Sequence, residues 1–474
     1  MCDPPTLLAF QFVFRRAILK FKKRMTQVGE AIARYHKLIE SEPYIDLAWA
    51  KALQDRIKAE KLGGRPISPV LRPHFITNRQ YAALVKAAES LFSAINRVEQ
   101  LALSNPALLA RMQLLPAERM LAQVDPGYSF FSVTGLLDTS LNNGSLRFVA
   151  HNSEAPAGVV YGDVLADLFY DAPPVKEFRK KYKLLKLGGA KYLLSALLKA
   201  YKDFGGKLKR PRIAIVEFRQ PFHSPDASEY ALLAEMFARE GCQTEIISPD
   251  QLEYRNGVLR RGEFAIDIVY RRVRLQEFLI RFDLSHPLVR AYKDRAVCMV
   301  NSFRSELGRK KAVFDLLTDD AVTSNFPAAE KRAIKEFIPW TRMVQAAKTT
   351  YRGHTVNLPE FVMKHRVKLV LKPNDDSAEL NSFRGAETDD LGWEKALRQA
   401  MRVPYVVQEV ADPARAVFPL MQYGSLIMKE MQIDVHPHSF LGKVHGCSSW
   451  LSVSGSNSFT TLTGLAPTFL LEAK

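Results

Sequence analysis

The feature that most constrains the fold is a run of apolar strands interrupted by an amphipathic helix between residues 212 and 272. The pattern predicts strands at residues 212–218, 244–247 and 266–272 and a helix at 228–240. Strands joined by helical crossovers lie parallel in one sheet, whereas antiparallel neighbours need only a short turn. We therefore expect a parallel α/β sheet in the middle of the chain.

The chain has 474 residues, which is too long for one hydrophobic core and predicts two or three domains. Apolar residues at spacings of three and four predict helices over residues 26–58 and 79–103, the second of them capped at residues 76–78. The other predicted elements are the strands 128–137, 146–149, 429–435 and 440–444, the turns 142–144 and 256–257, the helix 163–169 and a basic connector at 176–210.

The composition favours anionic partners. The 67 basic and 50 acidic residues give a net charge of +17, which suits nucleotides, phosphorylated metabolites, nucleic acid or acidic lipid. We find no sequence motif of a nucleic-acid-binding module, so we expect no nucleic-acid partner. The four cysteines are scattered without metal-ligand spacing, which predicts a reducing cytoplasm. The oligomeric state does not follow from the sequence.

The first 25 residues combine an apolar segment, residues 7–14, with a basic segment, residues 15–24. A secretory signal has the opposite order. One interpretation is an upstream extension, with Met25 opening the functional chain. The other is an amphipathic anchor at a membrane surface. No apolar run reaches the roughly twenty residues that cross a bilayer.

Two segments near the C-terminus predict a nucleotide site. Residues 368–376 read as a buried strand that ends in Lys372 and an acidic loop, and residues 405–409 as a second strand ending in Gln408 and Glu409. An ammonium group at a strand end neutralises phosphate, and an amide beside a carboxylate can recognise an adenine edge. The alternative is an edge-strand pair that faces solvent.

A magnesium site is the second candidate. Asp434 is predicted on a strand that faces the phosphates, and Asn152 provides a second oxygen donor of the kind that Mg²⁺ prefers. Arg271 follows a predicted strand end and suits the carboxylate of a substrate. A surface ion pair is the alternative for Arg271.

Taken together, these segments resemble the circularly permuted ATP-grasp proteins, the group with the glutathionylspermidine-synthase-like pre-ATP-grasp fold. The segments that carry the resemblance are 148–158, 301–304, 310–317, 369–374, 406–409 and 442–452. The resemblance implies an α/β ATP-grasp fold with a Rossmann-like pre-ATP-grasp domain and a helical N-terminal region. It also adds Lys310 to the nucleotide-binding residues, and it implies ATP and Mg²⁺ as cofactors.

The domain limits that follow are a basic extension at 1–25, a helical region at 26–120, permuted ATP-grasp strands with the Asn152 element at 121–170, the Rossmann-like domain at 211–300 and the ATP-grasp domain at 301–474.

The sequence departs from the family pattern at three places. Ala150 stands where the metal-binding element has glutamate, and Trp450 stands where a phosphate-facing arginine is expected. The loop at 376–385 lacks most of the glycines that let backbone amides close around phosphate. Arg384 could reach the phosphates and Glu154 could replace the lost carboxylate.

The resemblance therefore leaves two hypotheses. The first is an ATP-dependent ligase that joins a carboxylate to an amine through an acylphosphate, with a nucleotide and a small acid and amine as partners. The second is an inactive binding or scaffold protein on the same fold.

Overall fold

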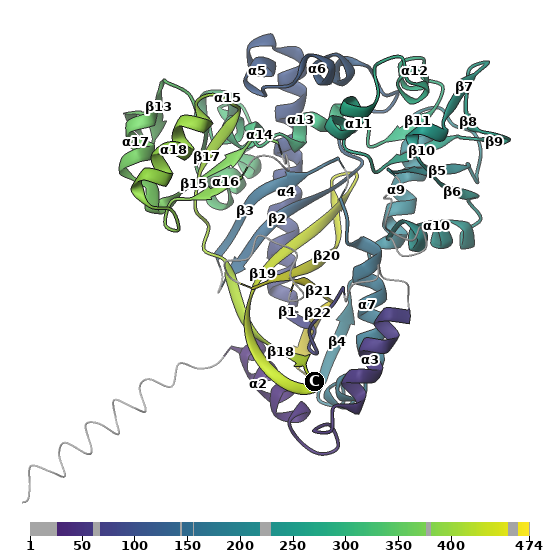
Figure 1. The fold of residues 1–474 in the computed structure, drawn as a ribbon, viewed down its shortest axis with the longest axis vertical. Coiled ribbons are helices and arrows are strands. Elements are labelled where there is room, and N and C mark those ends of the chain that lie inside the picture. The colour runs from purple at the N-terminus through teal and green to yellow at the C-terminus, as the bar shows by residue number, and fades with distance from the viewer. Residues whose placement is uncertain are drawn as a thin grey trace, which may run out of the picture.

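The computed structural model describes residues 26–59, 67–142, 145–154, 156–218, 229–375, 381–453 and 463–473 (Figure 1). The predicted basic extension, the proposed start at Met25, most of the turn 142–144 and the first half of the glycine-poor loop lie outside the described residues.

A large antiparallel sheet forms the middle of the molecule, and it combines strands from both ends of the sequence. Its order is β21 (Gly464–Ala466), β20 (Lys443–Ser452), β19 (Ser425–Phe440), β2 (Thr134–Asn142) and β3 (Ser145–Asn152), with β18 (Ala414–Gln422) pairing with β19. Segments about 300 residues apart are therefore hydrogen-bonded neighbours, as between Val435 and Thr139.

The strands predicted at 429–435 and 440–444 are wrong at their boundaries. Strand β19 is continuous to Phe440, and Leu441 and Gly442 then form a two-residue turn with φ values of 54° and 78°. Two successive positive φ values match the twist of an antiparallel hairpin, which explains why the chain reverses here. The predicted strand at 128–137 likewise begins later, at Thr134.

Helix α4 (Asn78–Ser104) lies against the central sheet and contacts β19 and β20 (Figure 1). The predicted cap is confirmed, because Thr77 and Gln80 form a reciprocal capping box. Leu84, Leu91 and Val98 of α4 are buried in the core below the sheet. The helix thereby covers the part of the sheet formed by β19 and β20.

The helix predicted at 26–58 is two helices, α2 (Gln27–Ile39) and α3 (Ala48–Ala59). Pro43 lies between them, and a proline disfavours helical backbone at the preceding residue and donates no hydrogen bond. Further along the chain come α5 (Pro106–Arg111), α6 (Pro116–Gln123) and α7 (Val159–Asp171), the last longer than predicted.

The basic connector predicted at 176–210 is wrong. The segment contains α9 (Ala190–Asp203), and before it α8 (Pro173–Phe178) and β4 (Tyr182–Lys186), which joins a small sheet in the order β1 (His74–Thr77), β22 (Thr468–Ala473), β4. Leu193 and Leu197 of α9 are buried while its lysines face outward, so the charge marks an amphipathic helix rather than a linker.

The predicted parallel sheet is confirmed. Its order is β11 (Cys298–Val300), β10 (Ile268–Arg271), β5 (Ile213–Val216) and β6 (Thr244–Ile247), and all three pairings are parallel. Neighbouring elements are α10 (Glu229–Arg239), α11 (Leu275–Arg281), α12 (Pro287–Lys293) and the small sheet β7 (Glu253–Arg255), β8 (Val258–Arg261) and β9 (Phe264–Ala265). The predicted turn at 256–257 joins β7 to β8.

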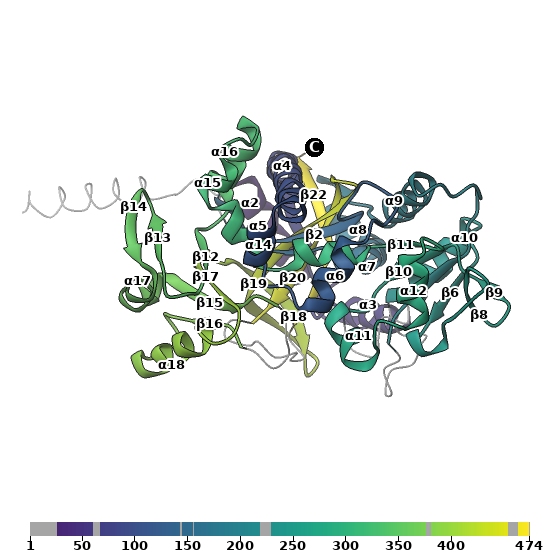
Figure 2. The same cartoon turned by 90° about the horizontal axis from the view of Figure 1, so that it is seen from above.

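A third sheet lies at the opposite end of the molecule (Figure 2). Its antiparallel order is β12 (Thr341–Met343), β17 (Tyr405–Glu409), β15 (Leu369–Pro373) and β16 (Phe383–Arg384). It packs on α17 (Leu358–Lys364) and α18 (Asp390–Ala400) around the buried Trp393. The hairpin of β13 (Lys348–Tyr351) and β14 (His354–Asn357) completes this region, which we call the small lobe.

Short helices link the small lobe to the rest of the molecule. They are α13 (Glu306–Arg309), α14 (Ala312–Leu317), α15 (Asp320–Thr323) and α16 (Ala328–Phe337). Helices α13, α14 and α16 all contact α4. Throughout the part of the chain that the structure describes, no helix has the length and apolar character required to span a membrane.

Candidate nucleotide site

Five of the residues predicted to bind nucleotide, phosphate or metal line one small cavity of about 70 Å³. They are Lys372, Arg384, Gln408, Glu409 and Asp434. The first four come from the small lobe and Asp434 comes from β19 of the central sheet. The cavity, which we call the junction cavity, therefore lies where the two sheets meet.

The strand register explains why Lys372 and Gln408 meet. Val370 of β15 is opposite Gln408 of β17, and Lys372 is opposite Val406. Residues two apart on a strand share a face, so Lys372 and Gln408 are diagonal neighbours on the same face of the sheet. The Nζ atom of Lys372 donates to Oε1 of Gln408 at 2.8 Å.

The remaining polar groups of the junction cavity are also paired. Nε2 of the buried Gln408 donates to Oγ1 of Thr341 at 3.0 Å. Oε1 of Glu409 accepts from the hydroxyl of Tyr351 at 2.7 Å and from Arg352 at 3.2 Å. The side chains selected from the sequence thus lie together, and Lys372, Gln408 and Glu409 already have partners within the chain.

Asp434 is the candidate magnesium ligand that reaches the junction cavity. Nε2 of Gln432 donates to both of its carboxylate oxygens, at 3.2 and 3.1 Å, and burial raises the pKa of Asp434. Asn152 ends β3 outside the cavity lining, and its Oδ1 accepts from the backbone of Glu154. Of the two candidate ligands, Asp434 lines the cavity and Asn152 does not, and Mg²⁺ in proteins is often held by one or two carboxylates together with phosphate oxygens.

No group of three or more His, Cys, Asp or Glu side chains within the described ranges is arranged to hold a metal ion. The position that departs from the family pattern, Trp450, lies on β20 directly opposite Asp434.

Arg271 and Lys310 do not line the junction cavity. They belong to a set of buried charges that we call the ion-pair cluster, made of Glu118, Glu154, Arg271, Glu306, Arg309, Lys310 and Asp375. Arg271 is fully buried and donates to Glu154 at 3.0 Å. Lys310 contacts Glu118 and Asp375, each at 2.7 Å. Their ligand-binding roles stay predictions, and both charges are already neutralised by the chain itself.

The proposal that Glu154 replaces the lost metal-binding glutamate does not fit this geometry. Its side chain is 2% exposed, and it accepts from Arg271, from Arg309 and from the backbone of Leu275. Although burial alone would raise it, the two arginines hold the pKa of Glu154 below its ordinary value. The carboxylate is fixed in the cluster and is not directed to the junction cavity.

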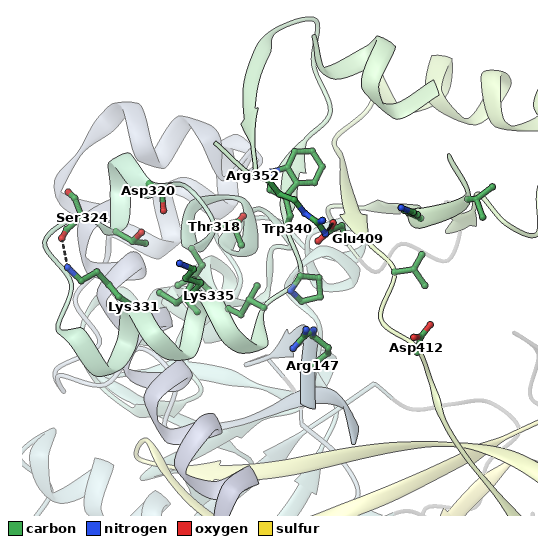
Figure 3. Close-up of a pocket in the computed structure, with 18 residues that line it drawn as sticks. Arg147, Thr318, Asp320, Ser324, Lys331, Lys335, Trp340, Arg352, Glu409 and Asp412 are labelled. Carbon is green, nitrogen blue, oxygen red and sulfur yellow. Dashed lines mark hydrogen bonds and ion pairs between the residues drawn. The ribbon is translucent and has the colours of Figure 1, made fainter. Parts of the chain in front are cut away.

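A much larger cleft, of about 1180 Å³, shares Glu409 and Val410 with the junction cavity (Figure 3). Its basic side chains outnumber its acidic ones, which are Asp320, Glu409 and Asp412. The basic ones are Arg147, Lys331, Lys335, Arg352 and Lys368. No sequence pattern predicts this cleft, because its walls come from β3, α16 and β17, which are far apart in the chain.

No protein-family model matches the sequence, and no curated protein matches it. Among solved structures, the chain is similar to a glutathione synthetase-like effector from Globodera pallida. The identity is 14%, the match covers 91% of this chain and 98% of the effector, and the TM-score is 0.56. A putative gamma-glutamylcysteine synthetase from Methylobacillus flagellatus matches with 10% identity over 84% and 89% of the two chains, at a TM-score of 0.43.

The match to the effector extends over nearly the whole of both chains. The predicted resemblance is confirmed at the level of the fold, which is a mixed α/β, ATP-grasp-like architecture, and the low identity marks this chain as a divergent form of it.

Proposed function

We propose that this protein binds ATP at the junction cavity and acts as a carboxylate–amine ligase of the ATP-grasp type. One observation carries the proposal: Lys372, Arg384, Gln408, Glu409 and Asp434 converge from two sheets on one point. They do so in a chain whose fold matches that of a glutathione synthetase-like effector along its length.

The side chains suit such a ligand. The ammonium of Lys372 and the guanidinium of Arg384 would bind phosphate oxygens, and the end of β17 at Gln408 and Glu409 would face the adenine edge. When bound, ATP supplies a transferable phosphoryl group. The acid substrate's carboxylate would take that group with release of ADP, and the amine would then attack the acyl carbon, displacing phosphate and losing a proton. Asp434 would hold Mg²⁺ together with the phosphate oxygens.

Binding requires the junction cavity to open. Its volume is about 70 Å³, whereas ligand pockets commonly have about 300 Å³ or more. An ammonium group has three donors, so Lys372 can contact phosphate while it still donates to Gln408. We infer that the small lobe moves away from the central sheet, which would join the junction cavity to the adjoining 1180 Å³ cleft through Glu409 and Val410.

The decisive experiment is calorimetric titration of ATP, with and without Mg²⁺, into the wild type, Lys372→Met and Lys368→Met. Lys368 is the matched control because it is exposed and lines the large cleft but not the junction cavity. We expect Lys372→Met to weaken binding at least about tenfold, about 1.4 kcal/mol, and Lys368→Met to have little effect. Equal affinities in the wild type and Lys372→Met would reject the proposed site.

The positions of the candidate metal ligands favour a second candidate function, in which the protein binds nucleotide without catalysing a reaction. Asp434 lines the junction cavity without Asn152, and Glu154 is held in the ion-pair cluster. Loss of charge neutralisation slows phosphoryl transfer more than it weakens binding. ATP binding without ADP release over a panel of acids and amines, both before and after the double change Ala150→Glu and Trp450→Arg, would select this candidate over the ligase.

A further inference from the structure

A separate cavity of about 290 Å³ lies between α4 and the central sheet, and we call it the α4 cavity. It is lined by Phe92, Asn96 and Glu99 of α4, by Phe130 and Ser132 before β2, and by His151 of β3. It shares no lining residue with the junction cavity. Side chains alternate along a strand, so His151 points to the opposite face of β3 from its neighbours Ala150 and Asn152.

Three buried polar atoms at this cavity have no hydrogen-bond partner among the described residues. They are Oε1 of Glu99, Nε2 of His151 and Oγ of Ser132. Glu99 is 1% exposed and His151 is 5% exposed. Buried polar atoms in folded proteins are nearly always paired, so three unpaired atoms around one space point to a missing partner. A single water occupies only about 30 Å³, far less than this cavity.

The partner must donate hydrogen bonds. Nδ1 of His151 lies 3.0 Å from the carbonyl of Gly308, so the neutral ring carries its hydrogen there and leaves Nε2 as an acceptor. A carboxylate oxygen accepts, and a bound cation would favour that ionised form of Glu99; a serine hydroxyl can also accept. An ammonium group has three donors, the number needed by these three atoms.

The charges around the cavity favour a cation. Lys443 at the rim is paired with Glu89 at 3.0 Å, which leaves the carboxyl group of Glu99 without a cationic side chain. The remaining wall contains the rings of Phe92 and Phe130, which suit an apolar group and attract a cation. Phe92 also meets His151 edge to face, with 5.6 Å between ring centroids.

A glycine keeps space beside the unpaired histidine nitrogen. A Cβ atom at Gly135 of β2 would lie 3.1 Å from Nε2 of His151 and 3.5 Å from the Phe92 ring. Gly135 is outside the cavity lining, and a methyl group there would crowd Nε2 of His151 without removing any polar atom.

We propose that the α4 cavity binds a small primary amine with an apolar body, its ammonium group donating to Glu99, His151 and Ser132. This site is independent of the proposed nucleotide site, because the two cavities share no lining residue.

The test is calorimetric titration of the full chain with benzylamine, benzyl alcohol and benzoate, which share a ring and differ in charge. We expect benzylamine to bind at least about tenfold more tightly than benzyl alcohol, and benzoate not to bind. Gly135→Ala should abolish benzylamine binding while thermal unfolding stays cooperative. Glu99→Gln, which keeps the shape and removes the charge, should lower the preference for benzylamine to below about twofold.

Lys372→Met separates this site from the nucleotide site, because it should reduce ATP affinity and leave benzylamine affinity unchanged. Any of four outcomes would overturn the proposal. They are equal binding of benzylamine and benzyl alcohol, tighter binding of benzoate, no binding of any probe, and unchanged benzylamine affinity in Gly135→Ala. The last two outcomes would mean, respectively, that water alone fills the cavity and that the amine binds elsewhere.

Discussion

Helix α13 (Glu306–Arg309) separates two buried polar regions that differ in one respect. Glu306 and Arg309 belong to the ion-pair cluster, where every charged group contacts an opposite charge. Gly308 of the same helix contacts Glu99 and His151 of the α4 cavity, where three polar atoms lack partners. Both regions are buried, and Oε1 of Glu118 in the cluster also lacks a hydrogen-bond partner among the described residues; the regions differ because each carboxyl group of the cluster contacts a cationic side chain, whereas Glu99 does not.

This difference in charge pairing shows which buried charged groups are available to a ligand. The ion-pair cluster has three cations, Arg271, Arg309 and Lys310, against four carboxyl groups. Burial and the nearby charge of Glu154 raise the pKa of one of these carboxyls, Glu306, to about 7. With that group protonated, three positive charges face three negative ones. The cluster therefore holds chain segments together, whereas the α4 cavity retains unpaired binding capacity.

The largest expected effect comes from breaking the paired region. Arg309→Met removes one of the two cationic partners of each of Glu154, Glu306 and Asp375, and should lower the free energy of unfolding by about 3–5 kcal/mol. Chemical denaturation measures this change. Arg398→Met is the matched control, since Arg398 is exposed and forms a surface ion pair with Glu394. Similar losses in both variants would show that pairing in the cluster contributes little.

A smaller decrease in the free energy of unfolding is expected for a substitution at the junction cavity. Lys372→Met leaves Oε1 of the buried Gln408 without its lysine donor and should cost about 1–3 kcal/mol. The same denaturation experiment on Lys368→Met should show almost no change, because that side chain is exposed. A neutral Lys372→Met would mean that the lysine–glutamine pair does not hold the cavity closed.

At the α4 cavity, removal of a carboxyl group should change the free energy of unfolding in the opposite direction, towards greater stability. Glu99→Met removes a buried carboxyl group whose Oε1 has no partner, and at neutral pH should raise the free energy of unfolding by about 1–3 kcal/mol. Glu118→Met is the matched change in the cluster and should destabilise, because it strips Lys310 of a partner at 2.7 Å. If both substitutions change the free energy of unfolding in the same direction, the proposed difference between the ion-pair cluster and the α4 cavity is wrong.

The pH dependence gives the smallest and most specific signal. Burial raises the pKa of Glu99 well above its ordinary 4.5. The folded protein then holds a proton that the unfolded chain releases, so the contribution of Glu99 is present below pH 4.5 and is lost as pH rises toward the folded pKa. The stability difference between Glu99→Met and wild type should grow with pH above 4.5, by at most about 1.4 kcal/mol per unit.

Asp163 and Glu217, whose pKa values burial raises to about 6 and about 7, titrate in both proteins and cancel in this difference. Denaturation curves at pH 4.5, 5.5 and 6.5 would therefore isolate Glu99. A difference that stays constant over this range would contradict a raised pKa.

The sequence predicted local structure well where the signal was local. The parallel strands, the Thr77 cap and the 256–257 turn follow from periodicity and turn chemistry within short windows. The sequence also indicated that Lys372 and Gln408 lie close together, because both residues are on strands whose apolar pattern is clear. The basic segment at 176–210 was misjudged because charge on an amphipathic helix resembles charge in a linker.

The sequence alone determined that this chain forms an α/β fold and which motif carries Lys372, because strand and helix periods are written in neighbouring residues. The tertiary structure decided which polar groups are paired. Arg271 meets Glu154 across 117 residues, and His151 meets Gly308 across 157. Whether a buried charge finds a partner depends on distances between remote segments, and no local pattern encodes them.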